Sequence, residues 1–259
     1  MKIWAHRGCS QNYPENTITS FKKACEIPGL TGIELDVQRT RDGKLVVIHD
    51  ETVDRTTNAS GFVRDFTLDQ LKKMDIETGM DYVEHIPTLD EVLDTIEYRL
   101  RGGMLLNIEL KTSVYDYPGI EREVVAAVEA RGLQDSIVYS SFSAKSLVML
   151  HMNAPYAKIG MLDCKISDCL IKTYGLESIF TAMDMEDGAE NMLCGDIALH
   201  PHWRDIDYDP MAFEGRIVRA FFGGHLFPEK PTGTRLDFAS LEKIGITDVF
   251  INEPEVYLL

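Results

Sequence analysis

The 259-residue sequence lacks several features that mark particular classes of protein. It contains no run of 18 apolar residues and no apolar N-terminal stretch of signal-peptide length, so we expect no transmembrane segment. Basic residues are scarce, because 26 Lys and Arg face 42 Asp and Glu and give a net charge of −16. No cluster of five or more basic residues occurs, which argues against nucleic acid as a partner.

Motifs that depend on cysteine or on glycine-rich loops are also missing. The five cysteines are odd in number and include no Cys-x-x-Cys pair, so we expect free thiols in a reducing cytoplasm. The patterns G-x-G-x-x-G, G-x-x-x-x-G-K-S/T, G-x-S-x-G and H-E-x-x-H do not occur. Nucleotide-binding folds, serine hydrolases and zinc proteases therefore receive no support.

Short β-type runs alternate with helical patterns along almost the whole chain. We predict strands at residues 3–5, 32–37, 44–49, 104–110, 136–140, 157–160, 196–200, 225–227 and 248–251. Helices are predicted between them, at residues 16–25, 67–74, 88–100, 119–130, 143–151, 167–174, 211–222 and 237–244, with Asn16 as the N-cap of the first. Helices between successive strands imply parallel pairing. Roughly eight strands in about 250 residues predict a (β/α)8 TIM barrel, an α/β fold.

The chain is expected to form one domain over residues 1–259. The stretch from 50 to 87 has only one predicted short helix and several turn signals, which is too long for an ordinary connection between a strand and a helix. We therefore predict that it is a small subdomain inserted after the strand that ends at His49.

Two predicted strands carry charged residues on one face. In the segment 32–37, Glu34 and Asp36 alternate with aliphatic residues, and in 106–111 Glu109 and Lys111 do the same. Strand geometry places such residues on one face, which in a barrel is the interior, where unpaired carboxylates are costly. Three carboxylates (Glu34, Asp36 and Glu109) would hold a divalent cation, Mg²⁺ or Ca²⁺, and Lys111 would meet a substrate phosphate. The alternative for the first segment is a solvated edge strand.

Two histidines lie where predicted strands end, at His6 and His49. Catalytic groups of such barrels lie at the carboxyl ends of the strands, so this pair is a candidate for general acid/base catalysis. Arg7, followed by Gly8, is a candidate phosphate clamp, although it could also pair with a nearby glutamate (Glu15 or Glu34). His200 is a weaker candidate, either a substrate contact at the barrel mouth or a hydrogen-bonded internal residue.

Seven short motifs follow one another in the first 111 residues. They are His6-Arg7-Gly8, Pro14-Glu15-Asn16-Thr17, Phe21-Lys22-Lys23-Ala24, Gly32-Ile33-Glu34-Leu35-Asp36-Val37, Thr40-Arg41-Asp42-Gly43, Val46-Val47-Ile48-His49-Asp50 and Ile108-Glu109-Leu110-Lys111. In this order they resemble the glycerophosphodiester phosphodiesterase family. The similarity is dense over residues 3–111 and thinner to the C-terminus, where residues 245–254 resemble the last strand and loop of that family.

The resemblance implies a (β/α)8 barrel that hydrolyses a small glycerophosphodiester to glycerol 3-phosphate and an alcohol. It implies one divalent cation, Mg²⁺ or Ca²⁺, held by Glu34, Asp36 and Glu109. By the same resemblance His6 and His49 are the general acid/base pair, and the phosphate contacts are Arg7 and Lys111.

The C-terminal third departs from the family pattern. The family usually carries a Trp-x-x-Asn-like strand that lines the pocket, whereas residues 225–232 contain two prolines. Phe227 is the candidate replacement for this aromatic wall, and Lys230 is a candidate head-group contact. Lysophospholipase D-type activity and a non-catalytic glycerophosphodiester-binding barrel remain alternatives, and a homo-oligomer is compatible with the sequence.

Overall fold

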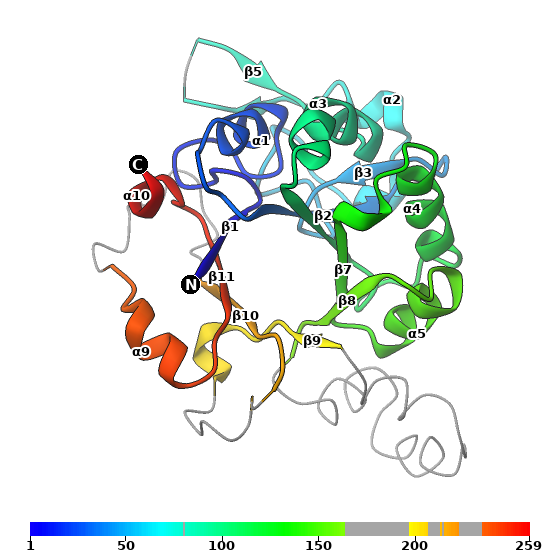
Figure 1. Cartoon of the computed structure of the whole chain (residues 1–259). Helices are drawn as coiled ribbons and strands as arrows, with labels where there is room; N and C mark the ends of the chain where they lie inside the picture. The colour runs from blue at the N-terminus through cyan, green and yellow to red at the C-terminus, as the bar shows by residue number, and fades with distance from the viewer. Residues whose placement is uncertain (80, 164–196, 207–212, 214, 223–234) are drawn as a thin grey trace.

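A computed structural model describes residues 1–79, 81–163, 197–206, 213, 215–222 and 235–259 (Figure 1). Within these residues, eight parallel strands run in the order β10-β11-β1-β2-β6-β7-β8-β9. Backbone hydrogen bonds from Leu199 N to Ile217 O and from Phe221 N to Pro201 O, both 3.0 Å, join the two ends of this series. The predicted TIM barrel is therefore confirmed. Its strands are β1 (Lys2–His6), β2 (Gly32–Arg39), β6 (Leu105–Leu110), β7 (Ile137–Ser141), β8 (Lys158–Met161), β9 (Ala198–Leu199), β10 (Arg219–Phe222) and β11 (Asp248–Ile251).

Helices lie outside the ring of strands (Figure 1). The described ones are α1 (Ile18–Cys25), α3 (Leu89–Arg101), α4 (Ile120–Glu129), α5 (Ala144–Asn153), α9 (Phe238–Lys243) and α10 (Glu255–Leu258). On β2, Ile33, Leu35 and Val37 are fully buried in the apolar core that these helices share. The residues between them therefore face the barrel interior. Because β2 pairs with β1 and β6, the edge-strand alternative is wrong.

The segment predicted as a parallel strand at 44–49 is instead the second arm of a hairpin. Strand β3 (Leu45–Val47) pairs antiparallel with β2, so it is not one of the eight barrel strands. The connection is a tight turn in which Gly43 has a φ of 77°, and no helix intervenes that would bring the chain back in parallel. His49 therefore follows a hairpin arm rather than a barrel strand.

Residues 50–87 contain short elements with their own apolar cluster. These elements are η1 (Val63–Asp65), α2 (Leu68–Leu71), β4 (Ile76–Glu77) and β5 (Val83–Glu84), and the last two form an antiparallel pair. The cluster consists of eight buried side chains, two of which belong to or follow β3: Val46, Ile48, Val53, Val63, Leu71, Met74, Ile76 and Ile86. This segment thus packs on the hairpin that carries His49.

Two further predictions of local structure are wrong. The helix predicted at 211–222 does not extend to its end, because Arg219–Phe222 is strand β10 and pairs in register with β11. The N-cap of α1 is Thr17, whose side chain accepts a hydrogen bond from Ser20 N, whereas Asn16 has a left-handed φ of 56°. The predicted strand at 225–227 and helix at 167–174 lie outside the described residues. Among the described helices, none is long and apolar enough to cross a membrane.

Candidate active site

A cavity of about 330 Å³ opens at the carboxyl ends of β1, β2 and β6. Its lining includes six of the residues predicted for the site: His6, Arg7, Glu34, His49, Glu109 and Lys111. Apolar side chains also contribute, among them Val114, Phe142, Leu162, Phe221 and Phe250. Asp36 lies beneath this surface and is fully buried.

Three carboxylates converge at the floor of this cavity. One ligand oxygen from each of Glu34, Asp36 and Glu109 can be chosen so that all lie within 4.8 Å of one another. Strand register explains the convergence, because Asp36 on β2 pairs with Glu109 on β6, and Glu34 lies two residues earlier on the same face of β2. Carboxylate oxygens are the ligands that a hard divalent cation prefers.

The charges around the cluster separate the pKa values of its members. Burial opposes ionisation of Asp36, but the charges of His49, Arg7 and Lys111 outweigh it and hold the pKa well below its usual range. Burial raises the pKa of Glu34, and the neighbouring charges of Asp36 and Glu109 raise it further. The negative charges of Glu34 and Asp36 therefore repel each other, and a bound cation would reduce this repulsion.

The cluster also has an unsatisfied ligand atom, which tests whether a cation fits it. Asp36 Oδ2 accepts a hydrogen bond of 2.8 Å from Asn16 Nδ2, whereas the buried Asp36 Oδ1 has no hydrogen-bond partner. A buried, acceptor-only oxygen without a partner fits a metal ligand. The residues present thus fit a divalent cation bound by oxygen.

The two histidines at the cavity have different partners. His6 donates from Nδ1 to Asn252 Oδ1 over 2.7 Å, which leaves Nε2 facing Glu34 Oε2 at 3.8 Å. Burial lowers the pKa of His6 well below its usual range, and the positive charge of Arg7 adds to this effect. His49 instead places Nδ1 at 2.6 Å from a carboxylate oxygen, Asp50 Oδ1.

Both cations of the site are paired with carboxylates. Lys111 Nζ lies 2.8 Å from Glu109 Oε1 and 3.9 Å from Asp36 Oδ1. Arg7 Nη1 contacts Glu15 Oε1 at 2.9 Å, and Arg7 Nε lies 3.3 Å from Asp36. The alternative partner proposed for Arg7, Glu15, is therefore present, and Arg7 still lines the cavity.

One candidate among the described residues, His200, is not brought to the cavity. His200 follows β9 but is fully buried inside the barrel, where Arg219 Nη1 donates to its Nε2 over 3.0 Å, and it does not line the cavity. The structure thus favours the internal residue over the substrate contact, because a side chain without exposed surface cannot meet a substrate. Phe227 and Lys230 lie outside the described residues.

Several residues near the reacting groups were not predicted as site residues. Asn16 holds Asp36, Asn252 holds His6 and Asp50 holds His49. All three belong to sequence segments that resemble the family. The resemblance therefore draws attention to these residues but does not say what they contact. Asn252 is 246 positions from its partner, and only the closed barrel brings β11 beside β1.

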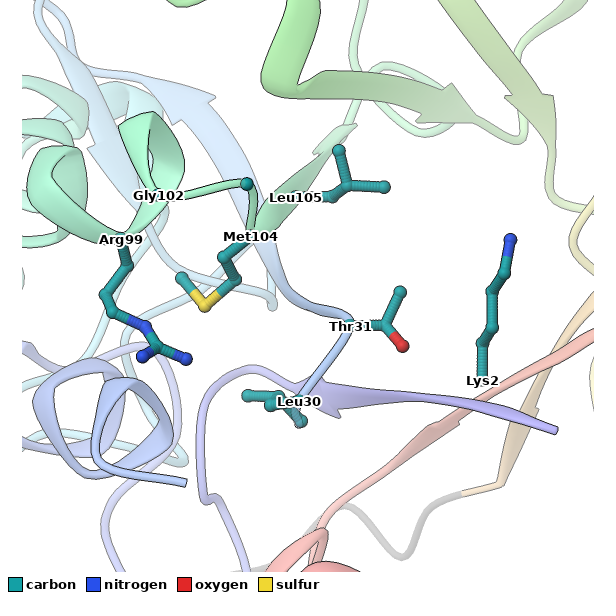
Figure 2. A pocket seen from close by; sticks show the side chains of 8 residues that line it. Lys2, Leu30, Thr31, Arg99, Gly102, Met104 and Leu105 are labelled. Atoms are coloured by element: carbon teal, nitrogen blue, oxygen red, sulfur yellow. The ribbon is translucent and has the colours of Figure 1, made fainter. Parts of the chain in front are cut away.

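A second cavity, of about 410 Å³, opens at the amino ends of the strands (Figure 2). Figure 2 shows Lys2 and Arg99 at this cavity on opposite sides of Thr31. Among the residues that the structure describes, its lining contains no carboxylate and no imidazole. It therefore offers neither metal ligands nor an acid/base pair.

Comparisons with known proteins agree with this geometry. The model of the glycerophosphoryl diester phosphodiesterase family matches residues 6–165. A protein of Caldanaerobacter subterraneus subsp. tengcongensis, named glycerophosphodiester phosphodiesterase, is 51% identical over 260 residues, covering 99% of this chain and 96% of that protein. A Bacillus subtilis protein of the same name is 31% identical over 271 residues, covering 98% of this chain and 84% of that protein.

Solved structures show the same barrel. An Oleispira antarctica phosphodiesterase in complex with the product sn-glycerol-3-phosphate has a TM-score of 0.71 at 26% identity, covering 99% of this chain and 94% of that one. A putative glycerophosphoryl diester phosphodiesterase from Silicibacter pomeroyi, at 20% identity, has a TM-score of 0.74 with 98% and 90% coverage and shows the fold alone. The chain belongs to the glycerophosphoryl diester phosphodiesterase family. The prediction that it is an enzyme of this family is confirmed.

Proposed function

We propose that the protein hydrolyses glycerophosphodiesters to sn-glycerol 3-phosphate and an alcohol with the help of one divalent cation. The observation that carries this proposal is a single cavity lined by two imidazoles above three converging carboxylates. Full-length similarity to proteins named for this activity supports the substrate class. We also infer that residues 1–259 form one domain, with 50–87 as an insertion.

Glu34, Asp36 and Glu109 would hold the cation, and their oxygen-only donors favour Mg²⁺ or Ca²⁺ over zinc. Bound there, the cation would neutralise negative charge on the phosphate oxygens and on the three carboxylates. Lys111 and Arg7 line the same cavity and supply fixed positive charge for the phosphate. Preorganised charges of this kind stabilise a transition state without reorganisation at the moment of reaction.

The different partners of the histidines suggest different roles in the first step. His6 is buried, and its lowered pKa keeps Nε2 unprotonated near neutral pH, so it suits a general base. It would remove the proton of the glycerol 2-hydroxyl, whose oxygen attacks phosphorus and forms a cyclic phosphate. The contact of His49 Nδ1 with the Asp50 carboxylate orients the ring, and we assign His49 as the acid that protonates the departing alcohol. Water then opens the ring with the two roles reversed.

Turnover of glycerophosphocholine by single variants tests the roles of the histidines. We expect His6→Ala and His49→Ala each to reduce kcat by about 10²–10⁴-fold while the fold survives. Rates near wild type in both would contradict the assignment. A substrate without the glycerol 2-hydroxyl should not turn over if the reaction passes through a cyclic phosphate.

Chelation tests the cation separately. Activity should be lost in EDTA and restored by Mg²⁺ or Ca²⁺, and Glu34→Ala should lose this restoration. Hydrolysis that is insensitive to EDTA would count against the cation. Lysophosphatidylcholine, assayed in parallel, separates the main activity from lysophospholipase D-type activity.

A further inference from the structure

Arg55 does not line the cavity, and its guanidinium bridges two carboxylates. Its Nε and Nη2 donate to Asp50 Oδ2 and Oδ1 over 2.7 and 3.0 Å. Its Nη1 and Nη2 donate to Glu15 Oε2 and Oε1, both over 2.7 Å. Because the guanidinium is planar and rigid, two paired contacts on one group fix the two carboxylates relative to each other.

Each of these carboxylates also contacts a residue that lines the cavity. Asp50 Oδ1 lies 2.6 Å from His49 Nδ1, and Glu15 Oε1 lies 2.9 Å from Arg7 Nη1. Contacts therefore run without a break from His49 through Asp50, Arg55 and Glu15 to Arg7. In the proposed function, His49 at one end of this series of contacts acts on the leaving alcohol, and Arg7 at the other end acts on the phosphate.

The backbones that carry these two ends are joined through a third strand, β2. Arg7 follows β1, and His49 follows β3, and the described residues contain no pairing between those two strands. Both strands pair with β2, β1 in parallel and β3 in antiparallel fashion. The side chains of Asp50, Arg55 and Glu15 add a direct connection between His49 and Arg7, and a shift of about 1 Å in their relative position can cost 10²-fold in rate.

We propose that Arg55 is a positioning residue for phosphodiester hydrolysis. It holds Asp50 and Glu15 as one rigid unit, so that His49 presents its Nε2–H to the leaving oxygen while Arg7 faces the phosphate. This inference rests on the roles of His49 and Arg7 in the proposed function. Arg55 itself touches no reacting atom, and it acts only through its two carboxylate partners.

The test compares two substrates that differ in the leaving alcohol. Glycerophosphocholine needs a proton on its leaving oxygen, whereas the 4-nitrophenyl ester of glycerol 3-phosphate releases a stable anion without one. For Arg55→Met we expect kcat on glycerophosphocholine to fall by about 10–100-fold, with less than about a threefold change in KM. The fall in the single-turnover rate of 4-nitrophenolate release should be at least about threefold smaller, because this first step needs no proton from His49 and only the placement of Arg7 is affected.

Two further variants sharpen the result. Arg55→Lys keeps the charge but cannot bridge both carboxylates in paired fashion, so it should remain on the order of fivefold or more below wild type on glycerophosphocholine. Arg131→Met is the matched control, because Arg131 also bridges two carboxylates, Asp90 at 2.8 Å and Asp94 at 2.9 Å, but these two carboxylates are exposed and do not line the cavity. Its turnover should stay within about twofold of wild type on both substrates.

Equal losses on both substrates would overturn the inference, and so would wild-type turnover of glycerophosphocholine by folded Arg55→Met. If Arg55→Met does not fold, Asp50→Asn interrupts the same chain of contacts with little change of shape and must show the same leaving-group dependence. Wild-type turnover by His49→Ala would instead refute the proposed function. Inactive His49→Ala beside fully active Arg55→Met would refute only the positioning role.

Discussion

The acidic cluster predicts a stability effect whose sign depends on the divalent cation. In Glu34→Gln, the amide oxygen can still accept the hydrogen bond from Arg7 N, which is 3.0 Å long in the wild type. The variant thus removes one negative charge with little change of shape. The ligand atoms of the three carboxylates lie within 4.8 Å of one another. At that distance, and with an effective dielectric constant of about 20, the repulsion energy of two carboxylates is about 3.5 kcal/mol. Arg7 and Lys111 offset part of this repulsion, so in cation-free buffer we expect Glu34→Gln to gain about 1–3 kcal/mol of stability.

A divalent cation should reverse this order. At a concentration of 100 times its Kd, a cation that binds only the folded state adds about 2.7 kcal/mol to the free energy of unfolding. Glu34→Gln has lost a charged ligand, so the cation should raise its free energy of unfolding much less. The wild type should therefore be the less stable protein in EDTA and the more stable one in excess Mg²⁺.

The pH dependence in EDTA follows from the same charges. Burial, together with the charges of Asp36 and Glu109, raises the pKa of Glu34 above its unfolded value, so the folded state binds the extra proton. The contribution of Glu34 to stability is then full below its unfolded pKa and is lost as the pH rises through the folded value. The two proteins should be similar in stability near the unfolded pKa, and the advantage of Glu34→Gln should widen as the pH rises.

Urea unfolding in EDTA and in Mg²⁺ at several pH values measures all three effects. The control is Glu51→Gln, which removes a carboxylate that lines the same cavity but lies outside the cluster, and it should change the response to Mg²⁺ little. The reasoning fails if Glu34→Gln is destabilised in EDTA, since its carboxylate would then serve the fold. An undiminished gain from Mg²⁺ in the variant would place the cation elsewhere.

Three more perturbations have definite expected outcomes. Asn16→Gly removes the buried hydrogen bond to Asp36 and should lower the free energy of unfolding by about 1.5–3 kcal/mol. Asn16→Ala should lower it by about 1 kcal/mol more, because position 16 has a left-handed φ of 56° that alanine adopts only with strain. Equal urea midpoints for the two variants would contradict this. A methyl group on Gly160 would overlap the buried ring of His200, so Gly160→Ala should cost about 1–3 kcal/mol, and an unchanged urea midpoint would show that the ring can move. Lys111→Met should bind Mg²⁺ about tenfold more tightly by calorimetry yet lower kcat/KM about 10²-fold, and parallel losses of both would argue for a structural role.

Local sequence patterns predicted the interior face of the barrel well. Alternation at 32–37 and 106–111 was enough to separate inward carboxylates from outward aliphatic residues, because each strand is covered by helices on one side only. The convergence of Glu34, Asp36 and Glu109 needed more than alternation. It depends on the register that sets Asp36 opposite Glu109, which no single segment encodes.

Contacts between distant segments were beyond a reading of local pattern. The alternation of strands and helices predicts a parallel strand at 44–49, whereas a connection of five residues, 40–44, sends that segment back along β2. The run at Arg219–Phe222 is short and apolar, and periodicity alone cannot decide between a helix and a strand for such a run; pairing with β11 makes it a strand. The partners of the two histidines, Asn252 and Asp50, could be chosen only after the barrel had closed.

The cavity combines opposite charges for a physical reason. The chain carries a net charge of −16, so its overall field repels an anionic phosphodiester. Around the floor of the cavity three carboxylates outnumber the two cations Arg7 and Lys111, which leaves the local charge negative as well. Binding of one divalent cation would turn this local charge positive while the distant field stays screened beyond about 8–10 Å at ordinary ionic strength. The cation that relieves the repulsion among the carboxylates would therefore also attract the substrate. The burial of Glu34, Asp36 and Glu109 thus accounts both for a cost in stability and for the affinity for phosphate.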